Sequence, residues 1–403
     1  MVTASAKPAR TIPPDGPIPA TEASGALMSD SLLITAFEPS GDRLAAKVIS
    51  RLREIRPELT IHAWGGPLMK EAGAVVHDDT VSHAAMGLGA LAHVQRIRSH
   101  HRDILAWSRE HQPVGLIPVD SPAANFPICK KLRPNGVKVI HLAAPQLWAW
   151  APWRSRKLRR CTDLVLCLMP FEPEWFAQHD IPARFVGHPA IDRGLDSEAD
   201  ARVAATMPQT DSRLLLMPGS RQQEINRNVP LMLKVVSQLR EHRPDLGVVM
   251  TAVDEEKAGM VHRELAASEG PIKVVVGQRD AALHWSQVAL AVSGTVTLDI
   301  MRHGKPMVGL YRTGVVGVLG AKVILTIKNR LLPNLIAGSR IVPEFVPYRG
   351  GPGPVARAVG HLLDSVEART CQEEAIAAAL SPYANTSFAT SASDAIIEVL
   401  DRQ

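Results

Sequence analysis

The feature that most constrains this fold is a pattern that occurs twice: a short apolar run, a glycine-containing turn and then a helical segment. The first copy is Leu32–Phe37 followed by Glu38-Pro39-Ser40-Gly41-Asp42, and the second is Leu214–Met217 followed by Pro218-Gly219-Ser220-Arg221. Further apolar runs alternate with helical segments after each copy. Buried strands that alternate with helices form right-handed βαβ units around a parallel sheet. We therefore predict an α/β protein with two doubly wound, Rossmann-like domains that face each other across a cleft.

The length and composition agree with two such domains. A chain of 403 residues is too long for one ordinary core, and an aromatic content of 4% favours the aliphatic strands of parallel sheets. Residues 1–30 are rich in Pro, Ala, Ser and Thr and lack an apolar core segment, which predicts a disordered extension rather than a secretory signal. We place the first domain at 31–191, a polar linker at 192–211 and the second domain at 212–403. A return of the last helices to the first domain stays open.

Charge, cysteine and histidine content argue against several classes of function. The net charge of +5 suits phosphorylated substrates or an anionic membrane surface but does not by itself indicate nucleic acid, and no nucleic-acid-binding motif is present. The four cysteines form no CxxC pair and the 15 histidines no metal-ligand spacing, so we expect no disulfide, no metal and no other cofactor. No apolar run is long enough to span a membrane, and we expect a cytoplasmic protein.

The second glycine turn has the features of an anion site. A strand that turns through Gly219 into a helix presents free backbone N–H groups and the positive end of the helix dipole. Ser220 and Gln223 fit a capping box, and Arg221 adds a permanent positive charge suited to phosphate. The alternative is an ordinary capped turn with a solvated arginine. Ser293-Gly294-Thr295 repeats the arrangement after another apolar run.

Two aspartates are candidates for contact with a sugar nucleotide or its acceptor. Asp299 lies one turn into the helix after Ser293-Gly294-Thr295, where it can accept hydrogen bonds from ribose hydroxyls. Acids are also favoured at helix N-termini for their own sake. Asp120 ends the apolar run 114–119, where doubly wound domains place catalytic carboxylates, and it can act as a general base. The alternative for Asp120 is a turn aspartate before Ser121-Pro122.

An aromatic segment, Pro145–Arg154, contains three of the seven tryptophans and is followed by the basic stretch 155–160. Aromatic side chains beside basic ones suit a lipid-bearing phosphorylated ligand or a membrane interface. A packed aromatic loop beside a solvated basic helix is an equal alternative. Val315–Ile327, with Lys322 as its single charge, fits either a membrane-contacting or a buried helix. Gly87–Ala92 matches GxGxxA, but no strand precedes it, so no dinucleotide site is predicted.

Taken together, these motifs resemble those of the lipid-A-disaccharide synthase family. The family's GExSGD motif is similar to residues 37–42, and its DxPDFN motif to residues 120–125. The matches follow the family's order over almost the whole chain from about residue 32. The others are Gly65-Gly66-Pro67-Leu68-Met69, Met86-Gly87, Trp148-Ala149-Trp150, Asp163-Leu164-Val165-Leu166, Pro170-Phe171-Glu172, Phe185-Val186-Gly187-His188, Pro218-Gly219-Ser220-Arg221, Ser293-Gly294-Thr295, Pro306-Met307-Val308 and Leu332-Pro333-Asn334-Leu335-Ile336-Ala337-Gly338.

The resemblance implies a GT-B fold and an inverting, metal-independent glycosyl transfer in lipid A biosynthesis. The implied donor is UDP-2,3-diacylglucosamine, and the implied acceptor is 2,3-diacylglucosamine 1-phosphate, which reacts through its 6-hydroxyl. Because both substrates carry acyl chains, the resemblance also implies peripheral contact with an anionic membrane, on the inner face of the inner membrane of a Gram-negative cell. A homodimer stays open, and no nucleic-acid partner is expected.

The resemblance also implies residue roles. Asp120 would deprotonate the acceptor hydroxyl, Arg221 would hold the diphosphate of the donor, and Glu38 would complete the catalytic group in the first domain. Two helix N-termini and Asn334 would help to bind the UDP phosphates. The expected substrate-binding residues are Ser40, Gly41, Asp42, Asn125, Trp148, Gly219, Ser220, Glu224, Ser293, Gly294, Thr295, Asp299 and Asn334.

The sequence departs from the family pattern at four positions. Phe37 replaces the glycine of GExSGD, and Ala123 replaces an acid of DxPDFN. Ala90 lies where an acid usually follows the Met-Gly motif, and Asp299 is shorter than the acid usual after Ser-Gly-Thr. These changes leave the acyl-chain length and the exact acceptor open. Two alternatives remain: another GT-B UDP-sugar transferase with a different lipid acceptor, or a catalytically inactive membrane-associated relative. Retention of Asp120, Arg221 and Asn334 together argues against the second.

Overall fold

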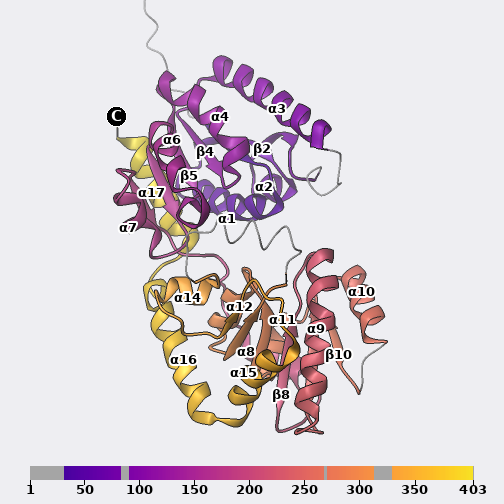
Figure 1. Ribbon diagram of the computed structural model, residues 1–403. Coiled ribbons are helices and arrows are strands. Elements are labelled where there is room, and N and C mark those ends of the chain that lie inside the picture. Colours follow the sequence, from indigo (N-terminus) through magenta and orange to yellow (C-terminus); the bar gives the residue numbers. More distant parts are fainter. Residues whose placement is uncertain (1–30, 83–89, 267–269, 313–328, 403) are drawn as a thin grey trace, which may run out of the picture.

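The computed structural model describes residues 31–82, 90–266, 270–312 and 329–402. Within these ranges the chain forms two parallel sheets, one with the strand order β3-β2-β1-β4-β5-β6-β7 and one with the order β10-β9-β8-β11-β12-β13. Figure 1 shows the two domains one above the other. The prediction of two doubly wound α/β domains is therefore confirmed.

The first domain contains the first sheet and the helices that connect its strands. The strands are β1 (Ser31–Ala36), β2 (Thr60–Gly65), β3 (Val75–Asp79), β4 (Gly115–Val119), β5 (Lys138–Leu142), β6 (Leu164–Cys167) and β7 (Ala183–Phe185). The helices are α1 (Pro39–Ile55), α2 (Pro67–Glu71), α3 (Ala90–His111), α4 (Pro122–Leu132), α5 (Leu147–Trp150), α6 (Ser155–Arg160) and α7 (Glu172–Ala177).

Alternating side chains of β1 explain the two layers of this domain. Leu32 and Ile34 point to one face, where they are buried with Val48 of α1. Leu33 points to the other face, where it is buried with Ile104 of α3. Because both faces of a parallel sheet are covered by helices, its strands are apolar along their whole length.

The second domain repeats this plan. Its strands are β8 (Arg213–Met217), β9 (Gly247–Ala252), β10 (Lys273–Val276), β11 (Val288–Val292), β12 (Met307–Leu310) and β13 (Glu344–Phe345). The helices of this half of the chain are α8 (Ser197–Ala204), α9 (Gln222–Arg240), α10 (Glu255–Leu265), α11 (Arg279–Trp285), α12 (Val296–Arg302), α14 (Leu332–Ile336), α15 (Pro352–Asp364), α16 (Val366–Leu380) and α17 (Phe388–Asp401).

The stretch expected to be a polar linker, 192–211, contains a helix. Ala204 at the end of α8 and Met207 after it are buried in the core of the second domain with Trp285 of α11. Trp285 Nε1 also donates a hydrogen bond to the carbonyl oxygen of Pro208, at 2.9 Å. Much of the expected linker is therefore packed onto the second domain.

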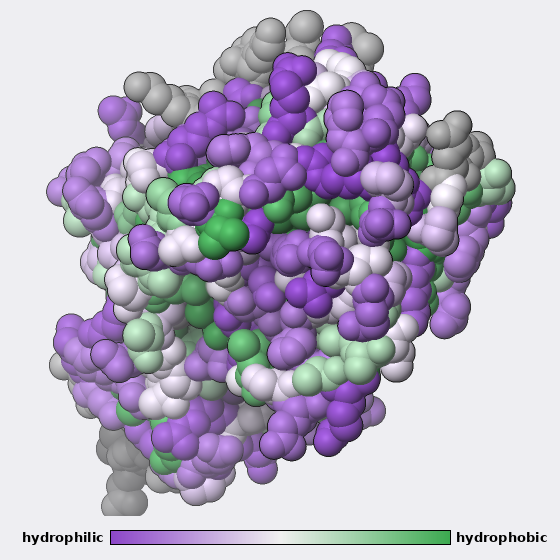
Figure 2. Space-filling view, turned by 90° about the horizontal axis from the view of Figure 1, so that it is seen from below, coloured by the Kyte–Doolittle hydropathy of each residue, from purple (hydrophilic) through white to green (hydrophobic). Residues whose placement is uncertain are grey.

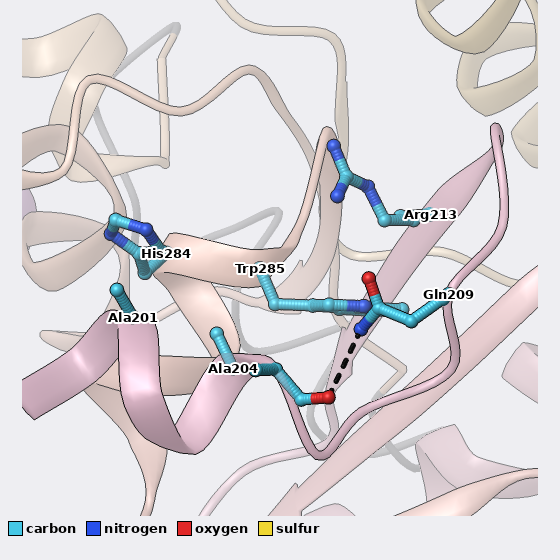
Figure 3. A pocket seen from close by; sticks show the side chains of 7 residues that line it. Ala201, Ala204, Gln209, Arg213, His284 and Trp285 are labelled. Carbon is cyan, nitrogen blue, oxygen red and sulfur yellow. Dashed lines mark hydrogen bonds between the residues drawn. The ribbon is translucent and has the colours of Figure 1, made fainter.

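A pocket of about 310 Å³ opens between α8 and α11. Figure 3 shows Arg213 and His284 near the indole of Trp285, with the alanines of α8 beside it. Arg213 begins β8, whereas the glycine turn at 218–221 follows the end of that strand, so the pocket lies at the opposite edge of the sheet from this turn.

Hydrophilic side chains cover most of the face seen in Figure 2, and hydrophobic ones appear between them in small groups.

The last helix leaves the second domain and packs against the first. Figure 1 shows α17 beside the first domain, whereas α15 and α16 lie in the second. Phe388, Ala392 and Ile396 of α17 are fully buried in the same core as Val48 of α1. The chain therefore completes the core of its first domain with its last helix.

This packing predicts that Phe388→Ala lowers the free energy of unfolding of the first domain by about 3–5 kcal/mol, because the substitution empties a fully buried site. Urea unfolding followed by tryptophan fluorescence measures this change, since all tryptophans except Trp285 precede residue 191. Val366→Ala is the matched control, because Val366 is 60% exposed. An equal and small effect of both substitutions would contradict the role of α17.

Candidate active site

Four loops lie at the two points where the strand order reverses. In the first sheet β1 and β4 are neighbours, and the chain winds outwards from them in opposite directions; β8 and β11 have the same position in the second sheet. Doubly wound sheets bind ligands at the carboxyl ends of the strands at such a point. The loops there begin at residues 37, 120, 218 and 293, and these are the loops that carry the sequence motifs.

The loop after β4 brings two carboxylates together. Asp120 and Ser121 have left-handed backbone conformations, with φ of 45° and 40°. Ser121 Oγ donates a hydrogen bond to Glu38 Oε1 at 3.1 Å, which joins this loop to the one after β1. Burial raises the pKa of Asp120, the Glu38 carboxylate raises it further, and a hydrogen bond from the Ser121 backbone opposes both. A carboxylate with a raised pKa is a stronger base, so Asp120 suits proton abstraction.

Asn125 supports this turn from inside the domain. Its side chain is fully buried, and Nδ2 donates to the carbonyl oxygens of Val119 at 3.1 Å and Asp120 at 2.8 Å. Oδ1 accepts a hydrogen bond from Thr35 Oγ1 at 2.8 Å. Both ends of the amide are therefore used within the fold and fix the backbone at Asp120. Contact between Asn125 and a substrate stays a prediction.

Asp42 is also used within the fold. Its buried carboxylate accepts hydrogen bonds from the backbone N–H groups of Gly66 and Met69, both at 3.1 Å, and of Leu68 at 3.2 Å. These N–H groups start α2 and have no partner inside that helix. Asp42 therefore caps α2 from a neighbouring segment.

Ser40 and Gly41 lie at the start of α1, next to the Asp120 loop. Ser40 is exposed, whereas Gly41 is buried. A Cβ at Gly41 would lie 3.3 Å from Ala36 Cβ and 3.4 Å from Val119 Cγ1, so glycine allows α1 to approach β1 and β4 closely. Of the two, only Ser40 presents a side chain to solvent.

Glu172, to which the sequence analysis gave no role, holds the aromatic loop. Trp148 Nε1 donates to Glu172 Oε1 at 3.0 Å, and Oε2 accepts from the N–H groups of Leu168 at 3.1 Å and Met169 at 3.0 Å. Burial raises the pKa of Glu172 to about 7, although these hydrogen bonds lower it. The sequence feature that could have pointed to Glu172 is its place in the motif Pro170-Phe171-Glu172. The buried Trp148 is thus anchored within the first domain.

The turn after β8 differs from the predicted anion site. Arg221 is the N-cap of α9 and Glu224 is its third residue, so the predicted capping box of Ser220 with Gln223 is wrong by one residue. Glu224 Oε2 accepts from the N–H groups of Ser220 at 3.1 Å and Arg221 at 3.2 Å, and Oε1 accepts from Arg221 Nη1 at 3.0 Å. Two N–H groups expected to be free are thus occupied. Gly219 has a φ of 107°, and a Cβ there would collide with the Glu224 carboxylate.

The loop after β11 leaves two of its three motif residues open to solvent. Gly294 and Thr295 are exposed, whereas Ser293 is half-buried and its Oγ donates to the carbonyl oxygen of Arg330 at 3.3 Å. The exposed pair lies at the start of α12. The position suits contact between the loop backbone and an anion, and this contact stays a prediction.

Asp299 is placed behind this loop and is paired with arginines. It is buried, Oδ2 lies 3.0 Å from Arg279 Nη1, and Oδ1 lies 3.8 Å from Arg302 Nη2. Burial raises the pKa of Asp299, and the arginines oppose this effect. Arg279 was missed by sequence reasoning, because no local pattern links it to Asp299.

Asn334 organises a loop of the second domain. It is fully buried, and its amide exchanges two hydrogen bonds with the backbone of Val342, at 2.8 and 2.9 Å. Nδ2 also donates to Glu344 Oε2 at 3.0 Å, and that oxygen accepts the N–H groups of Arg330 and Leu331, both at 3.2 Å. Glu344 had no signal in the sequence. The predicted contact between Asn334 and phosphate stays a prediction.

The structure thus forms two separate clusters of predicted residues. Glu38, Asp120 and Asn125 belong to one in the first domain, whereas Gly219, Ser220, Arg221 and Glu224 belong to one in the second. Within the described ranges, no hydrogen bond or ion pair joins Asp120 to Arg221.

Three further expectations concern metals, membranes and individual motifs. Among the described residues, no three His, Cys, Asp or Glu side chains gather to hold a metal ion, and no helix of those ranges is long and apolar enough to cross a membrane. The Met86-Gly87 motif, Val315–Ile327 and the first half of Gly87–Ala92 lie outside the described residues.

Comparison with known proteins gives a consistent result. A family model described as lipid-A-disaccharide synthetase matches residues 32–385. The chain is 32% identical over 352 residues to the lipid-A-disaccharide synthase of Anaeromyxobacter sp. (strain K), which covers 87% of this chain and 92% of the relative. It is 34% identical over 339 residues to that of Solibacter usitatus (strain Ellin6076), with 82% and 87% covered. The chain belongs to the lipid-A-disaccharide synthetase family.

Solved structures show the fold of this family member. A putative UDP-N-acetylglucosamine 2-epimerase from Listeria monocytogenes superposes with a TM-score of 0.57 at 14% identity, covering 92% of this chain and 96% of its own. MurG from Acinetobacter baumannii gives 0.55 at 12% identity, with 91% and 99% covered. Anabaena Alr3699/HepE, crystallised with UDP and glucose, gives 0.52 at 11% identity, with 93% and 100% covered. The predicted GT-B fold is confirmed, and family membership makes the protein a glycosyltransferase.

Three departures from the pattern of the lipid-A-disaccharide synthetase family lie within the described residues of the first domain. Phe37 is buried, with its ring centroid 6.4 Å from those of His100 and His101 on α3. Ala123 is exposed in the first turn of α4 and adds no second acid near Asp120. Ala90 begins α3.

Proposed function

We propose that this family member is a lipid-A-disaccharide synthase that joins UDP-2,3-diacylglucosamine to 2,3-diacylglucosamine 1-phosphate. The observation that carries the proposal is the pairing of the Asp120 and Glu38 loops at the reversal point of the first sheet, in a chain that matches the family over residues 32–385. Arg221 follows β8 at the reversal point of the second sheet. A base and a phosphate-binding cation are what a metal-independent transfer needs.

In the proposed reaction, Asp120 takes the proton of the acceptor's 6-hydroxyl while that oxygen attacks the anomeric carbon of the donor. A new carbon–oxygen bond forms, and the bond from the anomeric carbon to the β-phosphate oxygen breaks. UDP leaves with the electron pair, and attack from the opposite face inverts the anomeric configuration. Glu38 assists because its charge raises the pKa of Asp120 and because it fixes the loop through Ser121.

The second domain is proposed to bind the donor and to stabilise the leaving diphosphate. The side chain of Arg221 is 82% exposed, so its guanidinium is accessible to a ligand. The exposed backbone at Gly294 and Thr295 offers a further contact. Asp299 is buried and paired with Arg279 and Arg302, so we propose that it supports this loop through those pairs. Positive groups held where charge develops lower the barrier to bond cleavage.

Four other predicted binding residues are proposed to shape the site through the backbone. Asp42, Asn125, Trp148 and Asn334 are buried, and their polar atoms bond to the protein. A buried group with satisfied hydrogen bonds loses them when it turns toward a ligand, which is costly. Ser40 at the start of α1 remains free to meet the acceptor.

We also propose that the surface around α6 contacts an anionic membrane on the inner face of the inner membrane. Trp153 is 68% exposed, the most exposed large apolar side chain of the described residues. Arg154 and Arg156 beside it are exposed, and a pocket of about 360 Å³ is lined by Trp153, Arg156 and His179, among others. Interfacial tryptophan beside arginine favours binding to anionic lipid headgroups.

The direct test of the proposed function is a transfer assay with both substrates and EDTA, with the product followed by mass spectrometry. We expect disaccharide 1-phosphate and UDP in equal amounts, because each transfer releases one UDP. The product should form in the presence of EDTA, because the proposed mechanism uses side chains and no metal. Protein that binds UDP but gives no product from this acceptor contradicts the assigned acceptor and favours a different lipid acceptor.

Asp120→Asn is expected to lower kcat by a factor of about 10²–10⁴ while the affinity for UDP is retained, because only the base is lost. In the unsubstituted enzyme, kcat/KM declines as the pH falls through the raised pKa of Asp120, where the base becomes protonated. Glu38→Gln removes one cause of the raised pKa, so the decline moves to lower pH. Near-normal turnover in Asp120→Asn would rule out this base.

The membrane proposal predicts that Trp153→Ser and Arg156→Gln each weaken binding to phosphatidylglycerol vesicles by about fivefold, as expected for about 1 kcal/mol per interfacial contact. Cosedimentation at low salt measures the change, and phosphatidylcholine vesicles should bind weakly throughout. Arg263→Gln on the second domain is the matched control. Equal binding of all variants would exclude this surface.

A further inference from the structure

We propose that Glu224 is a positioning residue that holds Arg221 ready for the diphosphate of the donor and does not itself touch the substrate. The inference rests on the proposed function, because it assigns how the donor phosphates are recognised. Glu224 is the third residue of α9, and Arg221 is its N-cap.

The carboxylate of Glu224 is committed on both oxygens. Oε2 accepts two backbone N–H groups, those of Ser220 and Arg221, and Oε1 accepts Arg221 Nη1 at 3.0 Å. The residue is only 8% exposed, and Gly219 leaves room for the carboxylate because a Cβ there would collide with it. A negative phosphate is repelled by a carboxylate at contact distance, so direct contact with the donor is unfavourable.

Arg221 is held at one nitrogen and is open at the others. Its side chain is 82% exposed, and among the described residues Nε and the second terminal nitrogen have no partner. A long exposed arginine loses rotamer freedom when it binds a ligand. The bond to Glu224 restricts the guanidinium beforehand, so that less freedom is lost when the phosphate arrives.

The same carboxylate changes how the turn recognises an anion. In a glycine-rich phosphate loop, backbone N–H groups surround the phosphate. Here, two of those groups already bond to Glu224. Recognition of the diphosphate by this turn therefore depends mainly on the arginine, and the acid is its internal support.

The test is a double-mutant cycle on UDP binding, measured by calorimetry with Arg221→Ala, Glu224→Gln and the double variant. We expect Glu224→Gln alone to weaken UDP binding about tenfold and to raise the donor KM, because the charged partner of Arg221 is lost. In the Arg221→Ala background, Glu224→Gln should have no further effect, since the acid acts through the arginine.

Glu241→Gln, at the far end of α9, removes the same charge and should bind UDP like the unsubstituted protein. Equal losses from Glu224→Gln in both backgrounds, with a lowered Tm, would show that Glu224 only stabilises the turn. Tighter UDP binding in Glu224→Gln would show that the acid competes with the phosphate, which also overturns the proposal. Absence of UDP binding by the unsubstituted protein would instead refute the proposed function.

Discussion

Hydrogen bonds between loop backbone groups and buried polar side chains determine the shape of the candidate site. Loops at the ends of parallel strands contain N–H and C=O groups that no ladder satisfies, and an unpaired buried group costs about 1–3 kcal/mol. Asp42 and Asn125 meet this need in the first domain, and Glu224 and Asn334 meet it in the second. Each of these side chains bonds to at least two groups, so the loop it holds has one preferred conformation. The more exposed residues beside them are positioned by these bonds: Asn125 fixes the backbone of Asp120, and Glu224 fixes Arg221.

The two domains bond to each other near the points where the chain crosses between them. The chain leaves the first domain after β7 and returns to it before α17, and the two crossings bond to each other: the Asp192 carboxylate accepts the N–H group of Phe388 at 3.1 Å. Tyr383, at the end of the second domain, donates to the carbonyl oxygen of Leu168 at 3.1 Å. The segment 168–172 that Tyr383 meets is the one that Glu172 ties to Trp148. The segment that leads into α17 therefore contacts the first domain at two places: at Asp192, where the chain leaves that domain, and at Leu168, in the segment that Glu172 holds.

The fold was predictable where burial left a clear pattern. Central strands such as β4 and β11 are buried at every residue, so they appear in the sequence as uninterrupted apolar runs before a turn. The edge strand β3 escaped detection because it is partly exposed and carries His77, Asp78 and Asp79. Helix α8 was missed for a related reason: its one buried residue is the small Ala204, and its other residues are mostly polar or alanine, as in a linker. The regularity of β3 comes from its tertiary neighbours, whereas α8 also has a local start signal: the Asp196 carboxylate accepts a hydrogen bond from the N–H group of Ala199 at 3.0 Å.

Within the candidate site, the sequence motifs located the loops, but the bonds that their side chains make were not predictable. An acid that binds a ligand and an acid that caps a loop have the same chemistry, and whether Gln223 or Glu224 occupies the capping position depends on the register of the first turn of α9. That register is fixed by the left-handed backbone at Gly219, which no periodicity reports. The difference between buried groups that hold a loop and exposed groups that do not also applies to the departure from the family pattern at Ala123. The turn at Asp120 is held by Asn125 and Thr35, both fully buried, whereas Ala123 is exposed and bears none of these bonds. Replacing an acid by Ala123 therefore changes an exposed surface beside Asp120 while the position of Asp120 itself is preserved.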